Sequence, residues 1–174
     1  KQPIAWSCNW HKMIRGHEDI FEAIAESKVE VVSFCNYPGQ DKCKAPYLEN
    51  PVNLTRVDFS DWFAECYDNR DWYGWILEER FSDKAKIVYE FETFYNQSAY
   101  LYPAQAKLFR SLGAQMACMW HYLMPDYAQY VNGSHMLHLK CTPRKAASFA
   151  VAGAMFNSLS LYGATFIMGA GIAA

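Results

Sequence analysis

The sequence predicts an α/β fold built from four strand–helix units. Four short apolar segments alternate along the chain with longer segments in which apolar residues recur every three or four positions. Each short segment is a nearly continuous apolar run, which is typical of parallel strands buried on both faces. Regular alternation of such strands with helices produces either an open doubly wound sheet or a barrel.

The first two strands and the helix between them lie near the N-terminus. Residues 4–8 are the first expected strand, and residues 17–27 the first helix, because the apolar residues of that segment share one helical face. Residues 29–35 are short and rich in β-branched side chains, and the turn residues at 36–39 end this second strand. We expect a long loop after it.

The third unit begins at Asp58, which resembles a helix N-cap. The helical region that it opens reaches about Phe81, with an interruption near Asn69 or Gly74. Residues 86–91 then form the clearest strand of the sequence.

The fourth unit completes the pattern. A helix is expected over residues 98–112 and a further apolar strand over residues 115–120. After a polar and aromatic loop, Thr142 as N-cap and Pro143 at the first helical position start a last helix that reaches about Leu161.

Four such units are half of a (β/α)8 barrel, which needs about 250 residues when complete. The chain has 174 residues, which is enough for one domain. We therefore expect residues 1–163 to form a half-barrel, with residues 164–174 as an unassigned tail. On this interpretation the chain is truncated, or it needs a partner, a missing half-barrel or a second chain, to close its sheet.

Composition excludes several classes of function. The formal net charge is −2 and Lys and Arg do not cluster, so no nucleic-acid partner is expected. The longest apolar stretches fall short of the roughly 20 residues that span a bilayer, and no membrane partner is expected. The sequence holds no C-x-x-C, G-x-G-x-x-G, G-x-S-x-G or Walker motif, and we expect no cofactor. The location of the protein stays open, with a secreted or periplasmic one favoured.

Candidate functional residues stand at the carboxyl ends of the expected strands, where parallel α/β folds gather their active groups. Glu90 and Glu92 belong to the third strand and share its parity, so we expect both to project to one face. A carboxylate in a barrel interior is costly without a purpose or a partner, and it can act as nucleophile or general base. The alternative is a glutamate held by an arginine or by backbone N–H groups.

Aromatic and polar side chains accompany the carboxylates, and a flat ring offers a surface on which a sugar can stack. Aromatic residues make up 17% of the chain, so core packing remains an alternative for each ring. The expected substrate-binding residues are Trp6, Asn9, Trp10, Trp120, His121 and Tyr122.

The histidines support a weaker alternative, a metal-dependent barrel hydrolase. His11, His121, His135 and His138 follow expected strands or lie in a loop, and a carboxylate could complete a ligand set. The sequence lacks an H-E-x-x-H helix, so no metal ligand is assigned.

Three strands carry a resemblance to clan A glycoside hydrolases. Residues 86–92, Lys-Ile-Val-Tyr-Glu-Phe-Glu, resemble the seventh barrel strand of that clan, which presents the catalytic nucleophile, and Glu90 falls on that position. Residues 31–38 resemble the sixth strand, whose end supplies a tyrosine that hydrogen-bonds the nucleophile, here Tyr37. Residues 116–120 resemble the eighth strand, whose end carries the tryptophan beneath the sugar, here Trp120.

The resemblance implies that residues 4–161 supply strands five to eight of a retaining glycoside hydrolase that cleaves an oligo- or polysaccharide. Two features depart from the family. Glu92 stands where glycine is common, and the Asn-Glu pair that supplies the acid/base at the end of strand four is absent. The acid/base half of the barrel is therefore missing from this chain, and the alternative is a carbohydrate-binding protein on a degenerate barrel without catalysis.

Overall fold

The computed structural model of the chain describes residues 2–8, 14–43, 57–93, 98–122, 124–128, 130 and 137–162. Within them, four parallel strands form one sheet in the order β1-β2-β3-β4. The strands are β1 (Ala5–Cys8), β2 (Val31–Asn36), β3 (Ala85–Phe91) and β4 (Ala114–Met119). The predicted α/β class is confirmed, and each predicted strand lies within two residues of its expected bounds.

Helices follow each strand. They are α1 (Glu18–Glu26), α2 (Pro38–Cys43), α3 (Ser60–Asp68), α4 (Leu101–Ser111), α5 (Pro125–Ala128) and α6 (Pro143–Ser158), with short 3₁₀ helices η3 (Gly74–Leu77) and η4 (Glu79–Phe81). The break predicted near Asn69 or Gly74 is present between α3 and η3. The short helices α2 and α5 replace parts of expected loops, and each begins at a proline, whose fixed φ suits the first helical position.

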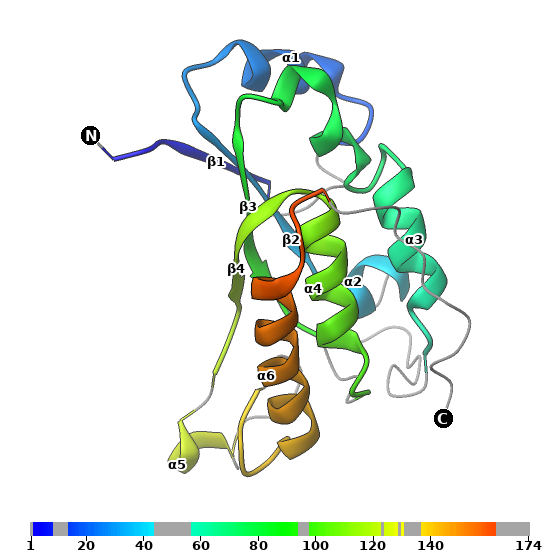
Figure 1. Cartoon of the computed structure of the whole chain (residues 1–174), viewed down its shortest axis with the longest axis vertical. Coiled ribbons are helices and arrows are strands. Elements are labelled where there is room, and N and C mark those ends of the chain that lie inside the picture. Colours follow the sequence, from blue (N-terminus) through cyan, green and yellow to red (C-terminus); the bar gives the residue numbers. More distant parts are fainter. Residues whose placement is uncertain are drawn as a thin grey trace.

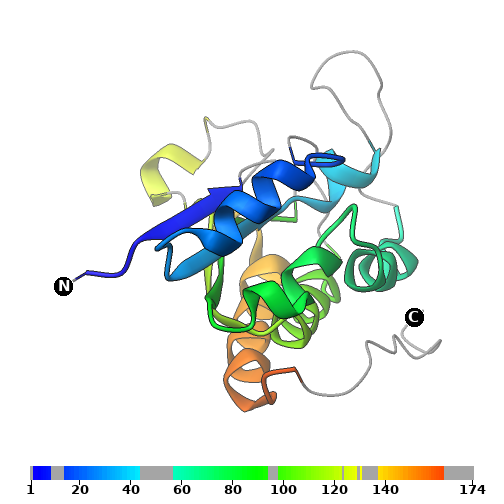
Figure 2. The ribbon, with the colours of Figure 1, turned by 90° about the horizontal axis from the view of Figure 1, so that it is seen from above.

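The consecutive strand order determines which face of the sheet the long helices cover. Because strand–helix–strand crossovers are right-handed, strands added in one direction place their helices on one and the same face. Figure 1 shows α3, α4 and α6 together on one side of the strands, and Figure 2 shows the same grouping from above. The other face of the sheet receives none of these long helices.

Aromatic side chains form the core between sheet and helices. Phe34 of β2 and Phe91 of β3 both pack on Phe109 of α4, with ring centroids 6.0 and 5.2 Å apart. At the amino end of the sheet, Trp75 of η3 packs on Phe21 of α1 at 5.2 Å. This core fixes the parity of the strands, because Phe34 and Phe91 face the helices and the residues that alternate with them face the opposite side.

An irregularity in β3 precedes the candidate site. Val88 pairs with Phe34, but the next residue of β2, Cys35, pairs with Glu90, so Tyr89 is an extra residue in β3. A β-bulge of this kind re-aims the side chains that follow it. Glu90 consequently projects on the same face as Cys35, and Phe91 returns to the helix layer.

The residues that follow α6 pack against the end of α4. The Arg110 guanidinium of α4 donates two hydrogen bonds to the Leu159 carbonyl, at 3.0 and 2.7 Å. The Tyr162 ring then lies over Gly113, the turn residue between α4 and β4. Among the described residues, no helix has the length and apolar character needed to cross a bilayer.

Candidate functional site

The candidate site lies where β2 and β3 end. Glu90 of β3 and Cys35 of β2 are registered neighbours, and Tyr37 follows β2 directly. The side chains of both Cys35 and Tyr37 hydrogen-bond Glu90, and all three residues are buried. The structure therefore brings together the two residues predicted as nucleophile and orienting tyrosine. It adds a thiol that the sequence analysis did not assign to the site.

Burial controls the protonation of the two donors. Desolvation, followed by the negative charge of Glu90, raises the pKa of the Tyr37 hydroxyl well above its usual range. The same two causes raise the pKa of the Cys35 thiol. At neutral pH both groups keep their protons, so both can donate hydrogen bonds to the Glu90 carboxylate.

A buried polar network holds the end of β2. The Gln105 side chain of α4 donates to Asn36 Oδ1 at 2.7 Å, and Asn36 Nδ2 donates to the Tyr73 hydroxyl oxygen at 3.3 Å. The Tyr73 hydroxyl in turn donates to the Cys35 carbonyl at 2.8 Å. These contacts tie residues 35 and 36 to α4 and to the segment before η3. They fix the backbone from which the Tyr37 side chain extends.

Glu92 does not share the environment of Glu90. Its carboxylate lies 2.9 Å from the Lys145 ammonium of α6 and accepts a 2.6 Å hydrogen bond from Tyr102 of α4. The expectation that both glutamates project to one face is wrong, because Glu92 stands one residue beyond the end of β3, where strand alternation no longer holds. The sequence alternative, a glutamate held by an arginine or by backbone N–H groups, describes Glu92 in part: the Thr93 N–H donates to its carboxylate, but the cation is a lysine.

The predicted aromatic residues differ in their surroundings. Trp120 and Tyr122, after β4, are 50% and 49% exposed, and the Tyr122 ring lies 5.9 Å from that of His138. Trp6 lies instead on the helix side, its ring 6.2 Å from Trp75, because Trp6 is in register with the core residue Val32. Trp6 therefore lies on the face opposite Glu90, and its role in sugar binding stays a prediction. Asn9 and Trp10 lie outside the described residues.

The two candidate histidines that the structure describes, His121 and His138, do not form a metal site with other described residues. His138 is buried, and its Nδ1 accepts hydrogen bonds from the backbone N–H groups of Lys140 and Cys141, at 3.2 and 3.1 Å. His121 is half-buried beside Met119. Within the part of the chain that the structure describes, no group of three or more His, Cys, Asp or Glu side chains could hold a metal ion. His11 and His135 lie outside that part.

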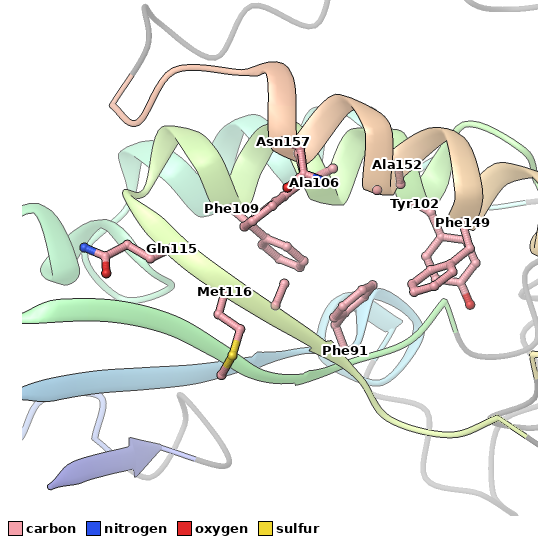
Figure 3. Close-up of a pocket in the computed structure, with 12 residues that line it drawn as sticks. Phe91, Tyr102, Ala106, Phe109, Gln115, Met116, Phe149, Ala152 and Asn157 are labelled. Carbon is pink, nitrogen blue, oxygen red and sulfur yellow. The ribbon is translucent and has the colours of Figure 1, made fainter. Parts of the chain in front are cut away.

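A separate cavity of about 280 Å³ lies on the helix side, between α4, α6, the end of β3 and the first half of β4. Figure 3 shows the rings of Phe91, Phe109 and Phe149 around it, with Met116 directed away toward the far side of the sheet. Its other lining residues are Tyr102, Ala106, Gln115, Ala117, Ala152, Gly153, Phe156 and Asn157. Glu90 does not line this cavity, so it is not the candidate site.

Comparison with known proteins found no match to this chain among protein-family models, curated proteins or solved structures. The functional conclusion consequently depends on the residues and their geometry.

Proposed function

We propose that the chain is the C-terminal half of a retaining glycoside hydrolase with a (β/α)8 barrel, and that Glu90 is its nucleophile. One observation carries this proposal. The Glu90 carboxylate stands at the carboxyl end of a parallel strand and accepts a hydrogen bond from Tyr37 at the end of the neighbouring strand. That pairing is the one implied by the resemblance to clan A glycoside hydrolases.

The topology supports the same proposal. Four parallel strands in consecutive order, with their long helices on one face, are what half of a (β/α)8 barrel contains. In a barrel the uncovered face becomes the interior, and the carboxyl ends of the strands carry the catalytic groups. Glu90 projects on this uncovered face because of the bulge at Tyr89.

The proposed mechanism gives each residue a defined task. Tyr37 donates its proton in a hydrogen bond to one Glu90 oxygen, which leaves the other oxygen to attack the anomeric carbon of the sugar. A covalent glycosyl-enzyme forms, and water then releases the sugar. The acid/base carboxyl that protonates the leaving oxygen comes from the other half of the barrel. Trp120 supplies an exposed ring for stacking against the sugar, and the reaction needs no cofactor.

A second candidate function is carbohydrate binding without catalysis. The ion pair between Glu92 and Lys145 favours this candidate. Because of that pair, Glu92 is not available to act as a second catalytic carboxylate beside Glu90. Binding would then depend on the exposed rings that follow β4, Trp120 and Tyr122.

The test is Glu90→Gln in a polypeptide that contains all eight strand–helix units. We expect turnover of an oligosaccharide substrate to fall by about 10³-fold or more with the fold retained, because an amide cannot replace the carboxylate nucleophile. Circular dichroism checks the fold, and Glu26→Gln, an exposed carboxylate on α1, is the control.

Unchanged turnover in Glu90→Gln would remove Glu90 from the mechanism. Calorimetric binding of an oligosaccharide by the unsubstituted protein, with no release of reducing ends, would favour the second candidate. In that case Trp120→Ala should weaken binding, whereas Glu90→Gln should change it little.

A further inference from the structure

We infer that Glu92 and Lys145 are positioning residues: their buried ion pair ties the end of β3 to the first turn of α6 and thereby holds Glu90 against Tyr37. The catalytic meaning of this inference rests on the proposed function of Glu90. The contacts on which it is built are independent of that function.

The ion pair is fully buried. Both carboxylate oxygens of Glu92 lie within 3.0 Å of the Lys145 ammonium, and the two side chains are 0% and 3% exposed. Lys145 also stands in the first turn of α6, where the positive end of the helix dipole disfavours a cation. Burial lowers the pKa of Lys145, while the charge of Glu92 acts in the opposite direction. A lysine in this place therefore depends on the Glu92 carboxylate.

Hydrogen bonds from Thr93 and from Tyr102 of α4 also fix the Glu92 carboxylate. It accepts hydrogen bonds from the backbone N–H and the hydroxyl of Thr93, at 2.5 and 3.0 Å, and from the Tyr102 hydroxyl at 2.6 Å. Elements that are far apart in the sequence thus meet at one side chain. Rotation of Glu92 would break all of these contacts at once, so its position is well determined.

A short path leads from this anchor to the candidate site. Only Phe91 separates Glu92 from Glu90, and its ring is packed against Phe109 and Phe149. The Glu92 N–H also donates to the Asn36 carbonyl at 3.3 Å, one residue before Tyr37. The anchor therefore holds the end of β3 and lies against the end of β2.

The anchor lies directly after the bulge. Tyr89 is an extra residue in β3, and pairing with β2 resumes at Glu90 and Phe91. The side-chain contacts of Glu92 add to this backbone pairing and hold the end of the strand against α4 and α6. Loss of the ion pair should therefore loosen the hydrogen bond between Tyr37 and Glu90 even while the sheet stays folded.

The test measures exchange of the Tyr37 hydroxyl proton with water, by NMR of the full chain labelled at the tyrosine ring carbon that bears the hydroxyl. Glu90→Gln serves as the reference, because it shows how much the exchange rate of the Tyr37 proton rises when its acceptor is weakened. In Glu92→Gln/Lys145→Met, which keeps a hydrogen-bond acceptor for Tyr102 and leaves no unpaired charge, we expect exchange at least tenfold faster than in the unsubstituted protein. The control is Arg70→Met/Glu78→Gln, which removes an exposed pair near α1 and should leave exchange within twofold.

Wild-type exchange in the folded double variant would overturn the inference, and any loss of stability would then be merely structural. If the double variant does not fold, Tyr102→Phe decides, because it removes one contact of Glu92 and keeps the ion pair; exchange there must rise, and no change overturns the inference. The measurement needs no substrate, so its failure is distinct from unchanged turnover in Glu90→Gln.

Discussion

At the scale of single residues, the molecule concentrates its buried polar groups around the ends of β2 and β3. Glu90, Glu92 and Lys145 are all buried there, and each has a partner of complementary charge or hydrogen-bonding character. A buried ion pair contributes little net stability compared with an apolar pair, but breaking one is costly, because the remaining charge stays buried without compensation.

Lys145→Met tests that asymmetry. The change leaves the Glu92 carboxylate without its cation, so we expect the free energy of unfolding to fall by about 3–5 kcal/mol. Denaturant titration measures the loss, and Lys28→Met, an exposed lysine, should change stability by no more than about 0.5 kcal/mol. A loss below about 1 kcal/mol would mean that the Glu92 carboxylate finds another partner.

Alkaline pH should destabilise the protein through its tyrosines. Burial raises the pKa of Tyr100 to about 12 and raises the pKa values of Tyr37, Tyr73 and Tyr102 further. The unfolded value is about 10, so the folded state binds more protons above that pH, and stability present below pH 10 is lost as the pH rises. The tyrosinate absorbance of these four residues should therefore appear together with unfolding. Ionisation of all tyrosines near pH 10 in the folded protein would contradict the assignment.

Sequence reasoning predicted Glu90 and Tyr37 because both stand where a parallel strand ends. It did not predict Lys145, because a lysine in the first turn of a helix resembles a solvated surface residue. The signal that could have found it is Glu92, a carboxylate after a buried strand that needs a cation. The contact of Trp6 with Trp75 could not be predicted, because the face that the helices cover is decided by tertiary packing.

At the scale of elements, the connection from α4 to β4 depends on one glycine. Gly113 has φ +82°, and a Cβ there would lie 2.3 Å from the Tyr162 ring. The same segment shows why element bounds were predictable, because apolar periodicity and turn residues are local signals. The short helices α2 and α5 were not predictable from periodicity, since neither is long enough to show a repeat.

Gly113→Ala should lower the free energy of unfolding by at least about 1–2 kcal/mol, because alanine is strained at positive φ and the ring of Tyr162 must also move. Gly153→Ala is the matched control. That glycine lies inside α6 with no atom within 4 Å of an added Cβ, so its replacement should stabilise the helix by up to about 1 kcal/mol. Equal effects of the two substitutions in thermal unfolding would contradict this account.

At the scale of the whole molecule, the α/β class and all four strands followed from the sequence, because each strand is a short apolar run that alternates with helical periodicity. Closure of the sheet could not be predicted in the same way. It depends on how strands pair beyond β1 and β4, and no local pattern encodes that pairing. The half-barrel is accordingly a proposal, whereas the four-stranded parallel sheet is observed.

Hydrogen exchange should reflect this arrangement. Backbone amides of β2 and β3 pair on both sides, whereas β1 and β4 each have one strand neighbour among the described residues. We expect amides of β4 to exchange faster than those of β3 in mass spectrometry of peptides from the folded chain. Equal protection of β3 and β4 would indicate that another strand or another chain covers the outer edge of β4.

The consecutive strand order has a consequence for self-association. The two edges of the described sheet are β1 and β4. If β1 of a second molecule pairs in parallel with β4 of the first, the contact is head-to-tail, because it joins two different surfaces. Such a contact repeats unless rotation closes the ring, and closure of two molecules would give the eight strands of the proposed barrel. If the ring does not close, one strand edge stays unpaired and can bind a further molecule, which produces a fibre. The curvature of the sheet therefore decides between a finite dimer and an aggregate.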